Sequence, residues 1–129
     1  MTTNFELIEA AKHLQIPNFN CVMRDQLKDV PSNDLMNLIL NSADSSTSGI
    51  HWVILHKNKD KVIYYSSFGD PVYQEVLDYF KGYRILTSDT RIQEFNTTIC
   101  GHLCILILFL IKQGHEFEDI ILSLQDIQI

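Results

Sequence analysis

Apolar positions along the chain follow two patterns, one with helical spacing and one of short runs rich in β-branched and aromatic residues. Helical spacing predicts four helices, at residues 5–14, 72–80, 100–113 and 116–124. The runs predict strands at residues 50–56, 62–66 and 83–87. The run 35–40 fits either a strand or a helical turn, residues 18–32 look irregular, and residues 44–49 form a loop.

Start and stop signals support these helices. Thr3 and Glu6 have the spacing of a capping box, in which each side chain satisfies a backbone N–H at the start of a helix. Asp70 can cap the second helix, with Pro71 at its first position. Gly114 stops the third helix. The order of elements predicts an α+β fold in a single domain, 1–129, with a small twisted mixed sheet packed on a central buried helix.

Composition narrows the function. The 129 residues carry a formal charge of −6, and ten scattered basic residues argue against nucleic-acid binding. Lys57, Lys59 and Lys61 belong to a predicted hairpin tip and should be solvated. The apolar run 103–111 is too short to cross a bilayer, and no export signal is visible. Three cysteines without a spaced framework favour a reducing compartment, so we expect an intracellular location, in the cytoplasm or nucleus.

The strongest chemical signal is Cys100 at the start of the predicted central helix. A thiol in the first turn of a helix is acidified by unsatisfied amides and the helix dipole. His51 opens a predicted strand after the polar loop, so its ring can act as general base. The amide of Gln93, with the backbone N–H of Cys100, can donate to an oxyanion. Gly101 lets the backbone approach a bound carbonyl. These are the parts of a thiol peptidase.

Other residues compete weakly for these roles. His13, His56 and His115 look solvated, and His102 cannot face its sequence neighbour Cys100 on a helix. Cys104 is expected to pack in the core. A zinc site from Cys100, His102 and Cys104 is disfavoured because ligands two apart on a helix diverge, so we expect no metal and no cofactor.

The order of these motifs resembles a known family. Gly49-x-His51-Trp52, then Tyr64-Tyr65-Ser66-Ser67-Phe68-Gly69, then Gln93 and Cys100-Gly101-x-x-Cys104 is similar to the adenovirus-type maturation proteases, or adenains. The compact forms in Polinton/Maverick transposons and related viruses are most alike. The resemblance extends to the stretch 18–27. It implies a fold of the ubiquitin-like-protein protease clan, with Cys100 as nucleophile, His51 as base and acid, Gln93 as oxyanion donor and Trp52 shaping the cleft.

The chain departs from the family at Ser66, where an acidic residue normally orients the imidazole. A serine hydroxyl can accept a hydrogen bond and fix the ring, but it adds no charge. Because a thiol peptidase starts from a thiolate–imidazolium pair, the loss should weaken the enzyme without abolishing it. Asp70 is a less favoured substitute, since Pro71 after it makes a helix cap the better interpretation.

The sequence therefore predicts a cysteine endopeptidase that cuts viral or transposon structural precursors, with polypeptide substrates and, by resemblance, an activating peptide or partner protein. Packaging in virions would follow from that role. Two alternatives stay open. One is an inactive binding module that keeps the cleft, favoured by Ser66. The other is a deconjugase acting on ubiquitin-like modifiers.

Overall fold

The fold is described from a computed structural model of the chain. The structure describes residues 3–41, 51–66, 71–90, 92 and 100–126. Gln93 and Asp70 lie outside the described residues, as does the predicted loop 44–49. Cys100 is described only as a helical residue, and its side chain lies outside the described part.

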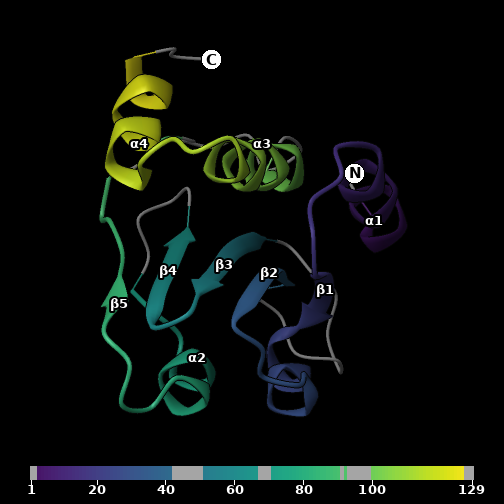
Figure 1. Cartoon of the computed structure of the whole chain (residues 1–129), viewed down its shortest axis with the longest axis vertical. Coiled ribbons are helices and arrows are strands. Elements are labelled where there is room, and N and C mark those ends of the chain that lie inside the picture. Colours follow the sequence, from purple (N-terminus) through teal and green to yellow (C-terminus); the bar gives the residue numbers. More distant parts are fainter. Residues whose placement is uncertain (1–2, 42–50, 67–70, 91, 93–99, 127–129) are drawn as a thin grey trace.

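Five strands form one mixed sheet in which the order in space follows the order along the chain (Figure 1). The strands are β1 (Phe19–Met23), β2 (Leu35–Asn41), β3 (Trp52–Asn58), β4 (Lys61–Ser66) and β5 (Ile85–Leu86). β1 is parallel to β2, β2–β3–β4 run antiparallel, and β5 is parallel to β4. The predicted α+β class with a small mixed sheet is confirmed.

Helices cover both faces of this sheet (Figure 1). One face packs on α1 (Asn4–His13), α3 (Cys100–Lys112) and α4 (Phe117–Asp126), and the other on the 3-10 helix η1 (Arg24–Asp29) and α2 (Gln74–Tyr79). Side chains alternate between the faces, as a strand requires. Ile54 and Tyr65 therefore join the core beneath α3, while Leu55 and Tyr64 join the core above α2.

The helix termini follow the local chemistry of the chain. The Thr3 hydroxyl accepts a hydrogen bond from the backbone N–H of Glu6 at 3.2 Å, which caps α1 as predicted. α3 buries Leu103, Ile107 and Leu108, and it ends two residues before Gly114, whose φ of +96° favours glycine. The central helix is therefore where the apolar run placed it.

Several predicted boundaries were wrong. The stretch 18–32, expected to be irregular, contains β1 and η1. Residues 35–40, by contrast, were predicted as either a strand or a helical turn, and the strand alternative is confirmed: they lie in β2, which pairs along its whole length with β3. α2 begins at Gln74 with Tyr73 at its N-cap position, so Pro71 is not its first residue. β3 begins at Trp52, which leaves His51 one residue before the strand.

Candidate active site

The imidazole of His51 and the hydroxyl of Ser66 meet at one end of the sheet. His51 directly precedes β3, and Ser66 is the last residue of β4, paired in register with Val53. The His51 Nε2 atom lies 2.9 Å from Ser66 Oγ, within hydrogen-bond distance. His51 is 5% exposed and Ser66 is fully buried. The hydrogen bond therefore fixes a ring that has little room to turn.

The first turns of α3 lie against the same end of the sheet. The Cys104 thiol donates to the backbone carbonyl of Trp52 at 3.5 Å, so this turn contacts the residue that follows His51. Residues four apart share one face of a helix, about one turn from each other. The backbone of Cys100, the first residue of α3, is thus one turn beyond this contact. Cys104 itself is 4% exposed and packs in the core as predicted.

Tyr65 contributes a second contact near this site. Its hydroxyl donates to the backbone carbonyl of Thr90, and its ring packs edge-on against Phe117 at 5.6 Å between centroids. Burial raises the pKa of Tyr65, so the phenol keeps its proton and acts as a donor. The contact anchors the chain three residues before Gln93. The sequence motif includes Tyr65 but gave it no role. Because Tyr65 directly precedes Ser66 in β4, its side chain points to the opposite face of the sheet and joins the core on the α3 side.

The structure thus brings together part of the predicted set. It places His51 against Ser66 and the start of α3 beside Trp52, while the side chains of Cys100 and Gln93 lie outside the described residues. Trp52 is 8% exposed and packs in the core under α3. Gly101 is buried in the first turn of that helix. The roles assigned to these residues stay predictions.

Two predictions about polar residues were wrong. His56, expected to be solvated, is buried, and its Nδ1 atom lies 2.7 Å from Asn37 Oδ1. Burial, and secondarily the charge of Lys61, lower the pKa of His56 to about 4. Lys57, expected at a solvated hairpin tip, is buried and donates to the Asn33 carbonyl at 2.8 Å. The hairpin turn is shorter than predicted, so Lys57 falls within β3 together with His56, which was already predicted to lie in this strand.

The remaining histidines and cysteines follow the predictions more closely. His13, His102 and His115 are exposed. Burial raises the pKa of the Cys21 thiol to about 12, which keeps it protonated at neutral pH.

Within residues 3–41, 51–66, 71–90, 92 and 100–126, no group of three His, Cys, Asp or Glu side chains could hold a metal ion. No helix in these ranges has both the length and the apolar character needed to cross a bilayer.

Comparison with solved structures relates the fold to a viral protease. The chain is similar to the crystal structure of ASFV pS273R protease, with a TM-score of 0.67 at 16% sequence identity. The match covers 92% of this chain and 60% of that protease, so the chain spans about three fifths of its length. No family model and no curated protein matches the sequence. The likeness shows a fold of the ubiquitin-like-protein protease type, as predicted.

Proposed function

We propose that this protein is a cysteine peptidase whose nucleophile is Cys100 and whose proton carrier is His51. The observation that carries the proposal is the hydrogen bond between His51 Nε2 and Ser66 Oγ, at the end of the sheet where α3 begins. Since Nε2 is held by Ser66, the other ring nitrogen, Nδ1, is the one assigned to the thiol. The similarity in fold to a viral protease supports the same activity.

In the proposed resting state, Cys100 is a thiolate and His51 an imidazolium. Both ring nitrogens then carry protons, and Nε2–H donates to the oxygen of Ser66. The start of α3 adds unsatisfied backbone N–H groups, which favour the thiolate. Ser66 thus orients the ring, while the helix and the ion pair supply the charge stabilisation that an acidic third residue would otherwise add.

The proposed reaction has two stages. The thiolate attacks the peptide carbonyl, the oxyanion rests on the Gln93 amide and the Cys100 backbone N–H, and His51 gives its Nδ1 proton to the leaving amine. His51 then removes a proton from a water molecule that attacks the thioester, which releases the acid and restores the Cys100 thiolate and the His51 imidazolium. One oxyanion donor is worth about 3 kcal/mol of the barrier.

For the substrate, we propose structural precursor polypeptides of a virus or transposon, cut inside a host cell in its cytoplasm or nucleus. The motif order around His51, Ser66 and Cys100 resembles maturation proteases of that kind, and the similar solved structure is a viral enzyme. An activating peptide or partner protein belongs to the same proposal. A deconjugase of ubiquitin-like modifiers would use the same residues with a different docking surface.

A binding module without activity is the second candidate. It is favoured by the burial of His51, which is only 5% exposed, and by the uncharged Ser66 beside it. In that case the hydrogen bond between the two side chains would serve to hold the end of the sheet together. The two candidates differ in whether Cys100 carries an activated thiolate.

Alkylation by iodoacetamide at pH 7, followed by peptide mapping, separates these candidates. A peptidase should be labelled selectively at Cys100, and His51→Ala should remove that selectivity. His13→Ala, at an exposed position on α1, is the matched control and should leave it unchanged. Cleavage of a peptide library or of ubiquitin-like conjugates would then distinguish endopeptidase from deconjugase. Equal labelling of Cys100 in the native and His51→Ala proteins would contradict the proposal.

A further inference from the structure

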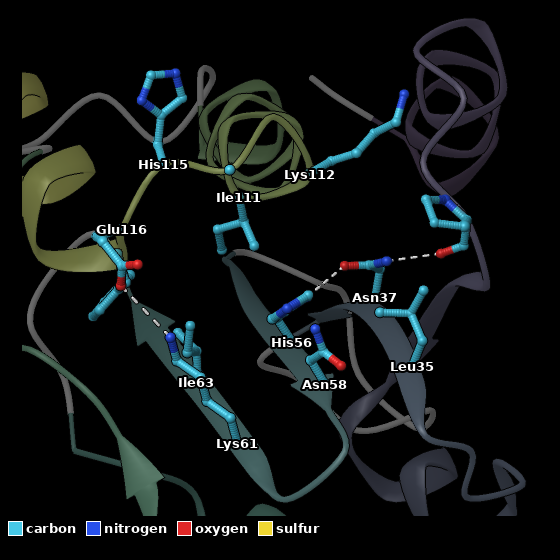
Figure 2. A pocket seen from close by; sticks show the side chains of 13 residues that line it. Leu35, Asn37, His56, Asn58, Lys61, Ile63, Ile111, Lys112, His115 and Glu116 are labelled. Atoms are coloured by element: carbon cyan, nitrogen blue, oxygen red, sulfur yellow. Dashed lines mark hydrogen bonds and ion pairs between the residues drawn. The ribbon is translucent and has the colours of Figure 1, made fainter.

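A second cavity lies at the other end of β3, on the face of the sheet that α3 covers. Its volume is about 390 Å³, which is within the range of binding sites. His56, Asn58, Lys61 and Ile63 line it from the sheet, and the turn from the end of α3 to the start of α4 closes the opposite side (Figure 2). Five residues of extended chain separate His51 from His56, about 16 Å. The cavity is therefore distinct from the candidate active site.

The cavity exists because α3 ends before the strands beneath it do. The register aligns two rows of side chains across β2, β3 and β4, which are Asn37–His56–Ile63 and Leu35–Asn58–Lys61. Ile111 of α3 lies over the first row (Figure 2). α3 ends at Lys112 and does not extend over the second row, where Asn58 and Lys61 are exposed. The cavity is thus shielded at the first row and open to solvent at the second.

A buried hydrogen-bond acceptor faces this cavity. The Nδ2 atom of Asn37 donates to the Pro17 carbonyl at 2.7 Å, which leaves its Oδ1 atom to accept from His56 Nδ1 at 2.7 Å. Nδ1 therefore carries the proton of the neutral imidazole, and Nε2 presents a lone pair. His56 is 7% exposed, and its Nε2 atom has no hydrogen-bond partner among the described residues. Because Nε2 is not sealed from solvent either, the cavity offers it to a ligand that brings an O–H or N–H group.

The charged side chains around the cavity leave it without a net charge. The Lys112 ammonium donates to the Leu14 carbonyl at 3.1 Å and points away from the cavity (Figure 2). Lys61 Nζ lies 3.7 Å from Glu116 Oε2, so these two charges offset each other at the opening. An ionic ligand would therefore find no unpaired charge of opposite sign on these three side chains.

The surroundings of His56 favour a neutral donor. Burial, and secondarily the charge of Lys61, disfavour a positive charge on its ring and lower its pKa to about 4. A ligand ammonium beside Nε2 would meet the same two penalties, and a carboxylate has no hydrogen to donate. Among neutral donors, a phenol, whose O–H has a pKa of about 10, donates more strongly than an aliphatic alcohol.

The rest of the lining suits a phenol that is attached to a peptide backbone. Pro17, Leu35 and Ile111 line the cavity and are not fully buried, so they have apolar surface left to cover a ring. The opening is polar, and Asn58 lies two residues along β3 from His56, about 6.6 Å, which is comparable with the length of a tyrosine side chain. With its hydroxyl at His56, a tyrosine would therefore bring its backbone amides to Asn58. A free phenol would leave this polar opening unused.

We propose that this cavity, the sheet-end pocket, binds a tyrosine side chain of a polypeptide partner. The phenol O–H donates to His56 Nε2, the ring packs against Leu35 and Ile111, and backbone amides of the partner contact Asn58 at the opening. This binding goes beyond the proposed peptidase activity and does not depend on Cys100, because none of the residues involved belongs to the candidate active site.

The test is a titration of the ¹⁵N-labelled full chain with the peptide Ac-Gly-Tyr-Gly-NH₂, followed by NMR. We expect saturable shifts at Leu35, His56 and Asn58, with the His56 Nε2 signal moving as it does when an imidazole nitrogen accepts a hydrogen bond. Two matched peptides should bind at least about fivefold more weakly, one with phenylalanine and one with O-methyltyrosine, because neither has the O–H donor.

Three results would overturn the proposal. The first is the absence of saturable shifts, and the second is equal binding of the three peptides. The third is a set of shifts centred on His51 and Ser66, which would place the peptide at the candidate active site. Binding of p-cresol as tight as that of the tyrosine peptide would overturn the polypeptide partner in favour of a free phenol.

Variants of the pocket separate the acceptor from the apolar walls. His56→Phe keeps a ring but removes the acceptor, so it should abolish the preference for the tyrosine peptide over the phenylalanine peptide. His13→Phe, at an exposed position on α1, is the matched control and should keep that preference. A His56→Phe variant that folds and still prefers the tyrosine peptide would contradict the role of Nε2.

A second variant tests the pocket without changing the buried histidine. Ile111→Ala, at a half-buried position near the end of α3, should weaken the tyrosine and phenylalanine peptides severalfold and by a similar factor. Leu106→Ala, on the same helix but outside the cavity lining, is its control and should leave both affinities unchanged. Unchanged affinities in Ile111→Ala would show that the peptides bind elsewhere.

Discussion

The imidazole of His51 lies 2.9 Å from the hydroxyl of Ser66, and both side chains are shielded from water. In this environment a neutral hydroxyl orients the ring but cannot stabilise its positive charge as a carboxylate would. Because Ser66 adds no charge, the proposed enzyme must rely more on the backbone N–H groups at the start of α3 to stabilise the Cys100 thiolate.

Substitutions at Ser66 should move activity in opposite directions. Ser66→Ala removes a hydrogen bond worth about 1 kcal/mol and should lower kcat/KM for a cleaved peptide roughly five- to tenfold. Ser66→Asp adds a charge beside the imidazolium and should raise kcat/KM and the alkylation rate of Cys100 near pH 6. Ser123→Asp, at an exposed position on α4, is the charge-matched control. Indistinguishable rates for the alanine and aspartate variants, with folding verified by circular dichroism, would refute this role for Ser66.

The three thiols should differ sharply in reactivity. Burial holds the pKa of Cys21 at about 12, and Cys104 is packed in the core. We expect iodoacetamide at pH 7.5 to modify only Cys100 in the folded protein, and all three cysteines in 6 M guanidinium. Mass spectrometry of the intact chain counts the adducts. Rapid labelling of Cys21 under native conditions would show that its surroundings differ from those described.

Two adjacent residues of α3 should differ in their contribution to stability. Ile107 is 1% exposed, and Ile107→Ala should lower the free energy of unfolding by about 2–5 kcal/mol, because it removes buried methyl groups and leaves a cavity. Leu106 is 40% exposed, and Leu106→Ala should cost about 1 kcal/mol or less. Urea denaturation measures both values. Similar losses for the two variants would mean that α3 faces the sheet with a different side.

Stability should depend on pH through His56. Its pKa is lowered from the ordinary 6.5 to about 4, so between these values the unfolded chain binds a proton that the folded chain does not. The free energy of unfolding should thus fall as the pH drops from about 6.5 to 4, by about 3 kcal/mol at most, and this contribution levels off below pH 4. Urea denaturation at several pH values across this range should show that the free energy of unfolding depends less steeply on pH in His56→Gln. In His13→Gln the dependence on pH should equal that of the parent protein. If His56→Gln left the pH dependence of the free energy of unfolding unchanged, this dependence could not be attributed to His56.

Sequence patterns were most informative where local chemistry and long-range packing agree. The capping box at Thr3, the apolar run of α3 and the glycine after it each specify a terminus or a buried face by themselves, and the structure has them where expected. β1 was missed because Asn20 interrupts its apolar residues, and because the polar residues Asn18 and Arg24 flank it on either side. Its pairing with β2 is a long-range property, because the two residues of every pair lie 18 positions apart along the chain, as Phe19 and Asn37 do.

The candidate site also combines features that the local sequence specifies with contacts between distant parts of the chain. Ser66 was singled out from its position in a motif, and the structure shows its contact with His51, which no local pattern encodes. His56 and Lys57 look like solvated residues by type, yet they are buried, because Asn37 and the Asn33 carbonyl supply partners from another part of the chain. Such pairings depend on strand register, and a one-residue slip would send each side chain to the other face.

The gradation of strand lengths across the sheet has a consequence for solution behaviour. The three inner strands have six or seven residues, whereas the outer strands β1 and β5 have five and two. An outermost strand exposes unpaired backbone groups that can recruit another molecule, and a short one offers few of them. We therefore expect the folded chain to resist intermolecular strand pairing at high concentration, so that aggregation, where it occurs, would begin from the unfolded chain.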